Sequence, residues 1–433
     1  MNENTKPGIN QRTFIDQLFK GDKGIWVIFA LLIGISILEV FTASGHSIPK
    51  NGDFIQPILR HTQLLTVSFI VMMIVINFPF KLFRITGRAL LSVSILLSIY
   101  IQLFGSAING GKRWFSIAGF QIQPSEFSKI GLIIILSGLV ADGLANPDKR
   151  KSKCKQALWM ITIVCFSVVL ENLSTALLIG ALGVTLLFVA GAYWKYLLEY
   201  VVGIITAGIF GLIVLASLPN NLTGPLARAN TWKARLERFT NGDDEKKDPS
   251  KVDFFNENAQ RNHSNVAIAS AGITGCGIGQ SNERSFLAEA NNDFIYSIII
   301  EETGILGGVV IIILYGWLFI RGWKIVRLAE KPFHKFMAAG VIIILAFQTI
   351  FNMFVSVGVM PVTGQTLPLI SKGGSSALTV CILLGILLKV SAEIRKKRDA
   401  ERAEDSDVSD WTGIEDHDQL VDINLEEVGD GLD

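Results

Sequence analysis

Residues 25–44 read IWVIFALLIGISILEVFTAS, an apolar run with a single charged side chain. A helix needs roughly 20 apolar residues to cross a bilayer core about 30 Å thick. Nine further runs of this kind lie near residues 63–80, 87–105, 127–144, 156–171, 173–191, 196–218, 293–320, 336–360 and 369–391. The sequence therefore predicts an all-α integral membrane protein with about ten transmembrane helices.

The composition excludes an ordinary soluble enzyme. Of the 433 residues, 50% are hydrophobic and only 18% are charged, whereas about 25% of residues are charged in a soluble domain. The net charge of +1 gives no reason to expect a nucleic-acid partner. The four cysteines form no CxxC pair, so neither a disulfide framework nor a zinc site is predicted; they are Cys154, Cys165, Cys276 and Cys381.

Lysines and arginines indicate the orientation, because cytoplasmic loops carry an excess of them. They cluster at 149–155, 321–335 and 395–398, which predicts that both termini are cytoplasmic. Three regions follow. Residues 1–24 form a cytoplasmic N-terminal segment without a removable signal peptide, and residues 25–395 form the membrane domain, with one long outer loop at 219–292 between helices seven and eight. Residues 396–433 form an acidic tail that is predicted to be disordered and that either solvates the chain or docks a cytoplasmic partner.

Four polar clusters fall on the outer side, where ionisable residues at membrane helix ends are usually functional. The first is NGGKRWFSIAGFQIQPSEFSK, residues 109–129. It places Lys112, Arg113 and Trp114 in a loop and Glu126 and Lys129 in the first turn of the next helix. The last two are i, i+3 neighbours. They form a structural ion pair, or Lys129 faces a polar cavity and meets an anionic ligand.

Carboxylates mark the second and third clusters. Glu171 lies at an outer turn between two helices, either as a cap for the next helix or as a functional group. Glu289 and Asp293 are four residues apart at the start of the eighth helix, so both could face one cavity. Asp293 is either the N-cap of that helix or a general base. Glu301 and Glu302 are expected two turns further in, well inside the span.

The fourth cluster is a broken apolar run over residues 352–379. Two prolines and several glycines predict an outer re-entrant loop, which membranes tolerate where it lines a cavity. Lys372, followed by Gly-Gly-Ser-Ser, presents a positive charge and backbone N–H groups that suit a phosphate, although a tight structural turn is the alternative. The clusters together indicate an outward cavity for a lipid-linked anion. This local chemistry fits a lipid-handling enzyme and a transporter equally.

These motifs resemble the RodA/FtsW (SEDS) family of bacterial shape, elongation, division and sporulation proteins over roughly residues 20–395. KRWFSIAG followed by QPSEFSK is one family hallmark, and DFIY followed by EETG is another. Departures occur at Asn291 and Asn292, where His-Thr is common, and at Thr363, where Lys is common. The family's C-terminal signature is matched by Asn352, Gly358, Pro361, Gly364, Ser371, Gly373, Gly374, Ser375 and Ser376.

The resemblance implies a peptidoglycan glycosyltransferase, more FtsW-like than RodA-like, that polymerises lipid II at the division septum of the bacterial inner membrane. The family's base aligns with Asp293. Positive charge for the leaving pyrophosphate would come from Arg113, Lys129 and Lys372, and a divalent cation (Mg²⁺ or Mn²⁺) could help, although the sequence shows no defined metal site. The other candidate substrate-binding residues are Lys112, Trp114, Glu126, Glu171, Glu289 and Ser371.

The implied partners are lipid II, the nascent glycan strand, a class B penicillin-binding protein that acts as transpeptidase, and division regulators. Two alternatives remain at this point. One is a lipid II flippase, for which Glu301 and Glu302 would be the transport residues. The other is a scaffold that only recruits the transpeptidase and would tolerate the loss of Asp293.

Overall fold

Long helices make up most of the computed structural model, which describes residues 19–46, 55–104, 114–117, 120–169, 171–217, 259–287, 290 and 292–415. Each of the ten predicted apolar runs overlaps one helix in these ranges. The helices are α2 (Lys23–His46), α3 (Ile55–Asn77), α4 (Phe80–Phe104), α5 (Pro124–Ala145), α6 (Arg150–Val169), α7 (Leu173–Val189), α8 (Trp194–Ser217), α11 (Ile295–Leu328), α12 (Pro332–Ser356) and α13 (Gly374–Glu415).

A short β-hairpin, a shorter α-helix and two 3-10 turns (Pro147–Lys149 and Glu283–Ser285) lie between these helices. Strands β1 (Phe115–Ile117) and β2 (Phe120–Ile122) pair antiparallel, with Ser116 opposite Gln121. Helix α10 (Ala259–Ser270) precedes α11. The membrane-helix fold class is confirmed, and this short hairpin is a local addition to it.

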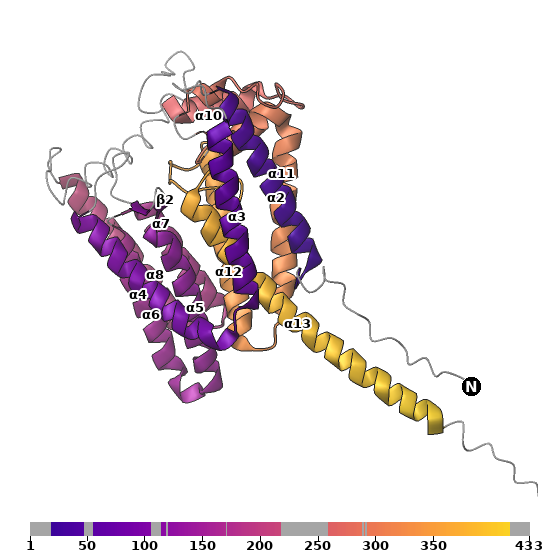
Figure 1. Cartoon of the computed structure of the whole chain (residues 1–433). Coiled ribbons are helices and arrows are strands. Elements are labelled where there is room, and N and C mark those ends of the chain that lie inside the picture. Colours follow the sequence, from indigo (N-terminus) through magenta and orange to yellow (C-terminus); the bar gives the residue numbers. More distant parts are fainter. Residues whose placement is uncertain are drawn as a thin grey trace, which may run out of the picture.

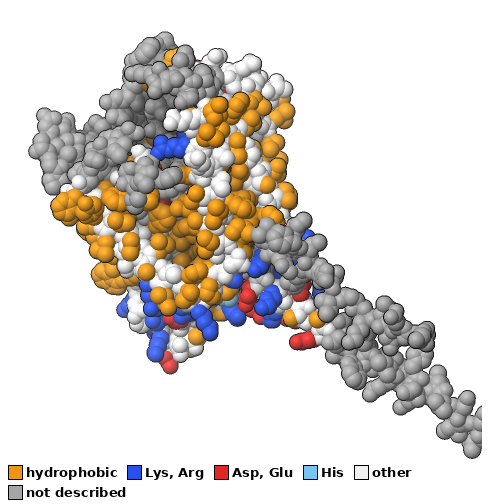
Figure 2. All heavy atoms as spheres, in the orientation of Figure 1, with side chains coloured by type: hydrophobic (Ala, Val, Ile, Leu, Met, Phe, Trp, Pro, Cys, Tyr) orange, Lys and Arg blue, Asp and Glu red, His pale blue; other side chains and the backbone are white. Residues whose placement is uncertain are grey.

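The surface of the bundle is apolar over most of its height. Within the described residues, eight helices are long and apolar enough to cross a membrane, and α7 is apolar but shorter. Helix α8 carries large hydrophobic side chains that are exposed on every side, such as Ile205, Ile209 and Phe210. A helix that is hydrophobic all round is stable only in an apolar medium. Figure 2 shows this band, with Lys and Arg gathered at its lower end.

The helices form two groups around a central layer (Figure 1). Helices α4 to α8 lie on one side, and α2, α3 and α11 lie on the other. Helix α12 contacts α5 and α7 in the first group and α11 in the second, while α13 packs along α3. The most apolar windows of α12 and α13 are 61% and 67% buried, against 22% for α3. The central layer is therefore protein-packed, and α3 faces the surrounding lipid.

Helix α11 is broken at Gly304, where the backbone adopts φ 75°. The loop before α11 docks its backbone onto this break: Cys276 donates its N–H to the carbonyl of Glu301 at 2.9 Å, and Ile305 donates to Gly272 at 3.1 Å. A Cβ on Gly304 would lie 2.1 Å from the carbonyl oxygen of Ile273. Only glycine permits both this φ and this approach, which explains the glycines of the GITGCGIGQ segment.

The break divides α11 into two parts of different length. Residues 305–328 alone span about 36 Å at 1.5 Å per residue, which suffices for a bilayer core of about 30 Å. Glu301 and Glu302 precede this stretch and are covered by loop residues. Both residues fall within the candidate membrane span Ile295–Leu328, and the loop 272–284 folds over that turn of the helix. Their depth in the membrane stays a prediction.

Two boundaries differ from the sequence-based expectation. Helix α12 ends at Ser356 and α13 begins at Gly374. The non-helical segment 357–373 is therefore wider than the gap between the predicted spans 336–360 and 369–391, and it lies inside the stretch 352–379 that was predicted to be re-entrant. Helix α13 continues to Glu415, although residues from 396 were expected to be disordered. Charge pairing favours helix here, since Lys397 contacts Glu401 at 3.5 Å and Glu330 at 2.5 Å. The tail from residue 416 onward lies outside the described residues.

Candidate functional site

The Asn292–Asp293 turn, immediately before α11, is held by hydrogen bonds to its backbone. Asn352, which is fully buried in α12, donates from Nδ2 to the carbonyl of Asp293 at 3.1 Å, and Ser356 donates from Oγ to the same oxygen at 3.1 Å. Ser371 donates from Oγ to the carbonyl of Asn292 at 2.8 Å. These bonds fix the main chain at Asp293, whose side chain is 7% exposed.

The same network reaches the start of α7. Asn352 Nδ2 also donates to the carbonyl of Gln365 at 2.8 Å, and Gln365 Nε2 donates to Thr175 Oγ1 at 2.9 Å. Asn172 Nδ2 donates to the carbonyl of Thr363 at 3.4 Å. The second, third and fourth clusters, far apart in sequence, therefore meet at one end of the bundle.

The structure does not support a helix-cap role for Asp293 or for Glu171. The N-cap of α11 is Phe294, with no side-chain cap, so Asp293 does not cap this helix. The cap of α7 is Asn172, whose side chain accepts a hydrogen bond from the N–H of Ser174 at 3.1 Å. Glu171, which is fully buried, lies just before this cap. Both carboxylates are thus buried at the site without serving as helix caps.

The first cluster contributes a buried ion pair. Lys129 Nζ lies 2.7 Å from Glu126 Oε1, and the Lys129 side chain is fully buried. This is the predicted i, i+3 pair, on a helix that begins at Pro124 as expected. Burial of a charge is costly unless it is paired, so the pair fixes the first turn of α5.

The hairpin of the first cluster lies beside the start of α13. A Cβ on Gly374 would be 3.7 Å from the carbonyl oxygen of Gln121 in β2. Trp114, which is partly exposed, directly precedes β1. The hairpin and the 357–373 segment therefore border one another, so all four clusters meet at this end.

Lys372 stands at the exposed edge of this region. Burial, together with the nearby charge of Arg60, lowers the pKa of Lys372 from its ordinary value. The chain before it is anchored to α2, because Ser36 donates from Oγ to the carbonyl of Ile370 at 3.0 Å and contacts His61 Nε2 at the same distance. Lys372 is thus a cation on a fixed backbone next to the Asp293 turn.

Ser371 has a positioning role in this structure. Its Oγ accepts a hydrogen bond from the N–H of Leu367 at 2.7 Å and donates to Asn292. Both bonds join the Ser371 hydroxyl to main-chain groups. The sequence suggested a contact of Ser371 with the substrate instead. Lys112, Arg113, Glu289 and Asn291 lie outside the described residues, as do all residues from 218 to 258.

A second buried cluster lies around Arg284, in the loop before α11. The guanidinium of Arg284 contacts Glu39 Oε2 at 2.5 Å and Glu302 Oε1 at 2.9 Å, and it donates to Thr42 Oγ1 at 2.6 Å. Glu301 accepts from Ser281 Oγ at 2.5 Å and from the N–H of Asn282 at 3.0 Å. The intramembrane carboxylates are therefore bonded to the loop, and they join α2, α11 and the loop into one unit.

Sequence reasoning missed the central part played by Asn352, Gln365 and Arg284. Asn352 was noted as a signature residue without a role, and Arg284 was not singled out. One signal was present: Glu39 is a lone carboxylate in an apolar span, and such a group requires a partner. The identity of the partner could not be read from the sequence, because Arg284 is 245 residues away.

No metal-binding set is present in the described part of the chain: no three His, Cys, Asp or Glu side chains lie close enough together to hold an ion. The four cysteines are free thiols.

Replacing Asn352 with Ala is expected to lower turnover about tenfold and to lower the melting temperature modestly. The change leaves buried carbonyls without a donor, at a cost of about 1–3 kcal/mol, and it loosens the turn that carries Asp293. Thr349→Val is the matched control, because Thr349 is equally buried in α12 but donates only to Leu345 of its own helix. Equal activities for the two variants would contradict the positioning role.

Comparison with known proteins gives one consistent result. The model of the cell cycle protein family that includes FtsW, RodA and SpoVE matches residues 22–396. The probable peptidoglycan glycosyltransferase FtsW of Bacillus subtilis is 29% identical over 395 residues, covering 87% of this chain and 93% of that protein. The protein of the same name from Geobacter metallireducens is 32% identical over 310 residues, covering 70% and 75% respectively.

Solved structures agree at the level of the fold. A chain of a peptidoglycan synthase complex that coordinates polymerization and crosslinking matches with a TM-score of 0.66 at 23% identity, covering 86% of this chain and 98% of its own length. The rod shape determining protein RodA of Thermus thermophilus matches with a TM-score of 0.59 at 22% identity, covering 86% and 96%.

Proposed function

Because the chain belongs to the cell cycle protein family of FtsW, RodA and SpoVE, we propose that it is a multi-pass membrane glycosyltransferase that polymerises lipid II into β-1,4-linked peptidoglycan. The observation that carries this proposal is the buried Asp293, on a turn that Asn352, Ser356 and Ser371 hold by the backbone alone. A buried carboxylate on a fixed turn can act as a general base toward a substrate hydroxyl.

In the proposed reaction the 4-hydroxyl of an acceptor sugar attacks the anomeric carbon of the growing chain. The new C–O bond forms as the bond to the lipid pyrophosphate breaks, with inversion of configuration. The hydroxyl proton passes to Asp293, and positive charge stabilises the departing pyrophosphate. Lys372 is the described cation best placed for this second role, since it lies beside the Asp293 turn and makes no ion pair with the described residues.

Replacing Lys372 with Ala is expected to lower polymerisation about tenfold or more, and Thr363→Ala should have little effect. Thr363 occupies the position where many family members carry lysine, so Lys372 supplies the charge that is absent there. The measurement is the initial rate of glycan formation by each purified variant. Equal small effects of the two substitutions would contradict the assignment of Lys372 as the cation that stabilises the pyrophosphate.

The pH dependence provides a separate check on Lys372. Its lowered pKa means that the ammonium deprotonates below the ordinary value of about 10.4. Activity should therefore fall on the alkaline side earlier than for an unperturbed lysine. Lys372→Arg keeps the charge at alkaline pH, so we expect it to move this loss to higher pH; an unchanged alkaline limb would show that another group titrates.

The buried carboxylates favour an enzyme over a lipid II flippase. Glu301 is bonded to Ser281 and Asn282, and Glu302 is bonded to Arg284. These groups hold a loop and do not line a transport path. For the proposed membrane placement, the end with the α3–α4 and α11–α12 connections faces the cytoplasm together with both termini, and the Asp293 end faces outward.

The proposed partner is a class B penicillin-binding protein, and the proposed setting is the division septum of the bacterial inner membrane. Support comes from the FtsW-named relatives and from the likeness to a chain of a peptidoglycan synthase complex. Division regulators are proposed as further partners. The nascent glycan strand and lipid II are the proposed substrates.

The test is incubation of the purified chain with labelled lipid II, with and without its partner transpeptidase, followed by separation of the products by length. Glycan polymers that depend on this chain are expected. Movement of intact lipid II across vesicles without polymer would indicate a flippase. A complex that forms with the transpeptidase but yields no polymer under any condition would indicate a scaffold.

A further inference from the structure

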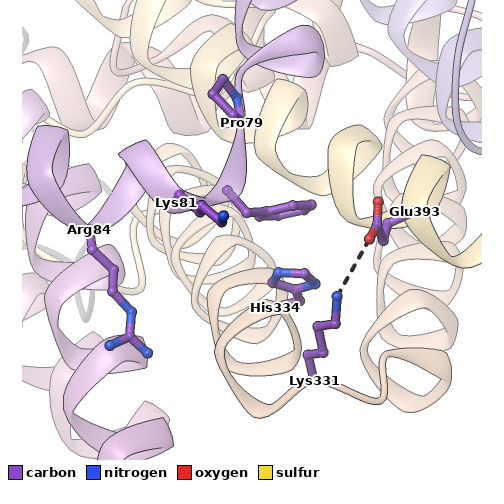
Figure 3. A pocket seen from close by; sticks show the side chains of 7 residues that line it. Pro79, Lys81, Arg84, Lys331, His334 and Glu393 are labelled. Carbon is purple, nitrogen blue, oxygen red and sulfur yellow. Dashed lines mark ion pairs between the residues drawn. The ribbon is translucent and has the colours of Figure 1, made fainter.

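A hollow of about 610 Å³ lies at the opposite end of the bundle from Asp293, between the starts of α4 and α12 and the side of α13. It is lined by Pro79, Phe80, Lys81, Arg84, Lys331, His334 and Glu393 (Figure 3). His334 and Asn352 lie on the same helix, about 27 Å apart at 1.5 Å per residue. The hollow is therefore separate from the candidate glycosyltransferase site.

Aromatic rings form one wall of the hollow. The ring of Phe80 stacks on the imidazole of His334, with centroids 3.7 Å apart and an angle of 22° between the planes. Lys389 Nζ lies 5.4 Å from the centroid of the Phe80 ring. A flat, partly apolar wall with an ammonium group over it suits a ligand that has both a charged and an uncharged part.

Positive charge exceeds negative charge around the hollow. Arg84 is paired with Asp142 at 2.9 Å, and Lys331 contacts Glu393 at 3.6 Å. Within the described residues Lys81 makes no ion pair. Lys20 and Lys396 add further positive charge near Lys389. In Figure 3 the side chains of Lys81, Arg84 and Lys331 border the hollow. The hollow is therefore basic, and its positive charge favours the binding of an anion.

The hollow lies at the level where a lipid headgroup would be. Helices α4 and α12 begin at Phe80 and Pro332, so the hollow is at their first turn. On α4, the adjoining side chains of Leu82 and Ile85 are 42% and 63% exposed and face the lipid. Basic pockets between membrane helices at this depth bind anionic headgroups, and long lysine side chains reach toward the headgroup layer.

We propose that this hollow binds the phosphate of an anionic phospholipid headgroup. Lys81, Arg84 and Lys331, which line the hollow, surround the phosphate. Lys389, over the Phe80 ring, adds positive charge nearby, and the Phe80–His334 pair packs against the glycerol. The acyl chains then run along the exposed apolar face of α4. This proposal does not depend on the proposed glycosyl transfer, because it concerns other residues at the other end of the bundle.

The test is native mass spectrometry of the full-length protein, titrated in detergent with phosphatidylglycerol or with phosphatidylcholine of the same acyl chains. The wild type is expected to bind the first phosphatidylglycerol at least tenfold more tightly than phosphatidylcholine. The double variant Lys81→Gln/Lys389→Gln is expected to lose about tenfold of this affinity, since each basic residue near an anionic lipid contributes several-fold. Both lysines are near the surface, and an unchanged melting temperature checks the fold.

The matched control is Lys149→Gln/Lys324→Gln, which removes two exposed lysines from the same end but outside the hollow. It should bind phosphatidylglycerol like the wild type. An equal loss in both double variants would mean diffuse charge attraction and would overturn the site. So would equal binding of the two lipids. Displacement of the lipid by glycerol 3-phosphate at similar concentration would reassign the hollow to a soluble phosphate ligand.

Discussion

Replacing Asp293 with Asn is expected to abolish polymerisation of lipid II while the protein stays folded in the membrane. The amide keeps the size of the side chain but cannot accept a proton at neutral pH, and general-base catalysis contributes about 10²–10⁴-fold. The fold should tolerate the change because Asn352 and Ser356 bind the main-chain carbonyl of Asp293. The measurement is the rate of labelled glycan formation, with melting temperature recorded in parallel.

The control for this experiment is Asp142→Asn. Asp142 pairs with Arg84 at 2.9 Å, and both side chains are about two-fifths exposed; such surface pairs contribute about 0–1 kcal/mol. This variant should polymerise lipid II like the wild type. Wild-type-like polymerisation by the Asp293→Asn protein would refute the general-base assignment, and loss of both activities would point to a general effect of carboxylate removal.

Replacing Arg284 with Met is expected to lower the free energy of unfolding by about 3–5 kcal/mol, since breaking a buried ion pair leaves an uncompensated charge. Here two carboxylates, Glu39 and Glu302, lose their partner, and both are nearly fully buried. The measurement is thermal or denaturant unfolding of the purified protein in detergent.

Two further variants separate this effect from simple loss of an arginine. Arg327→Met removes an exposed arginine from the far end of α11 and should leave unfolding unchanged. Adding Glu39→Gln to Arg284→Met removes one of the stranded charges and should restore part of the lost stability. If Arg284→Met unfolds like the wild type, the cluster does not hold the loop to α2 and α11.

The membrane helices could be predicted from the sequence because each one coincides with an apolar run, and such runs are visible in the local composition. The candidate base could also be found, because Asp293 stands in front of such a run and within a family motif. The hydrogen bonds that join the clusters to one another could not be predicted. The bond from Gln365 to Thr175 links residues 190 positions apart, and no periodicity encodes a partner at that distance.

The break in α11 could not be predicted for a similar reason. Hydropathy measures how apolar a window is, and the span Ile295–Leu328 is apolar as a whole although it contains EETG. The break at Gly304 depends on a positive φ and on a neighbouring loop backbone, neither of which contributes to hydropathy. The helical extension of α13 to Glu415 was missed for the opposite reason: a strongly charged stretch indicates disorder by composition, while pairs such as Lys397–Glu401 favour helix.

The contact between Gly275 and Gly304 has a mechanical consequence. A Cβ at Gly275 would lie 2.3 Å from the carbonyl oxygen of Glu302, so the two backbones touch with no side chain between them. Side chains can change rotamer and absorb a displacement, but two backbones in contact cannot. A displacement of the loop before α11 is therefore expected to move the short helical segment 295–303, which leads directly from the turn that carries Asp293.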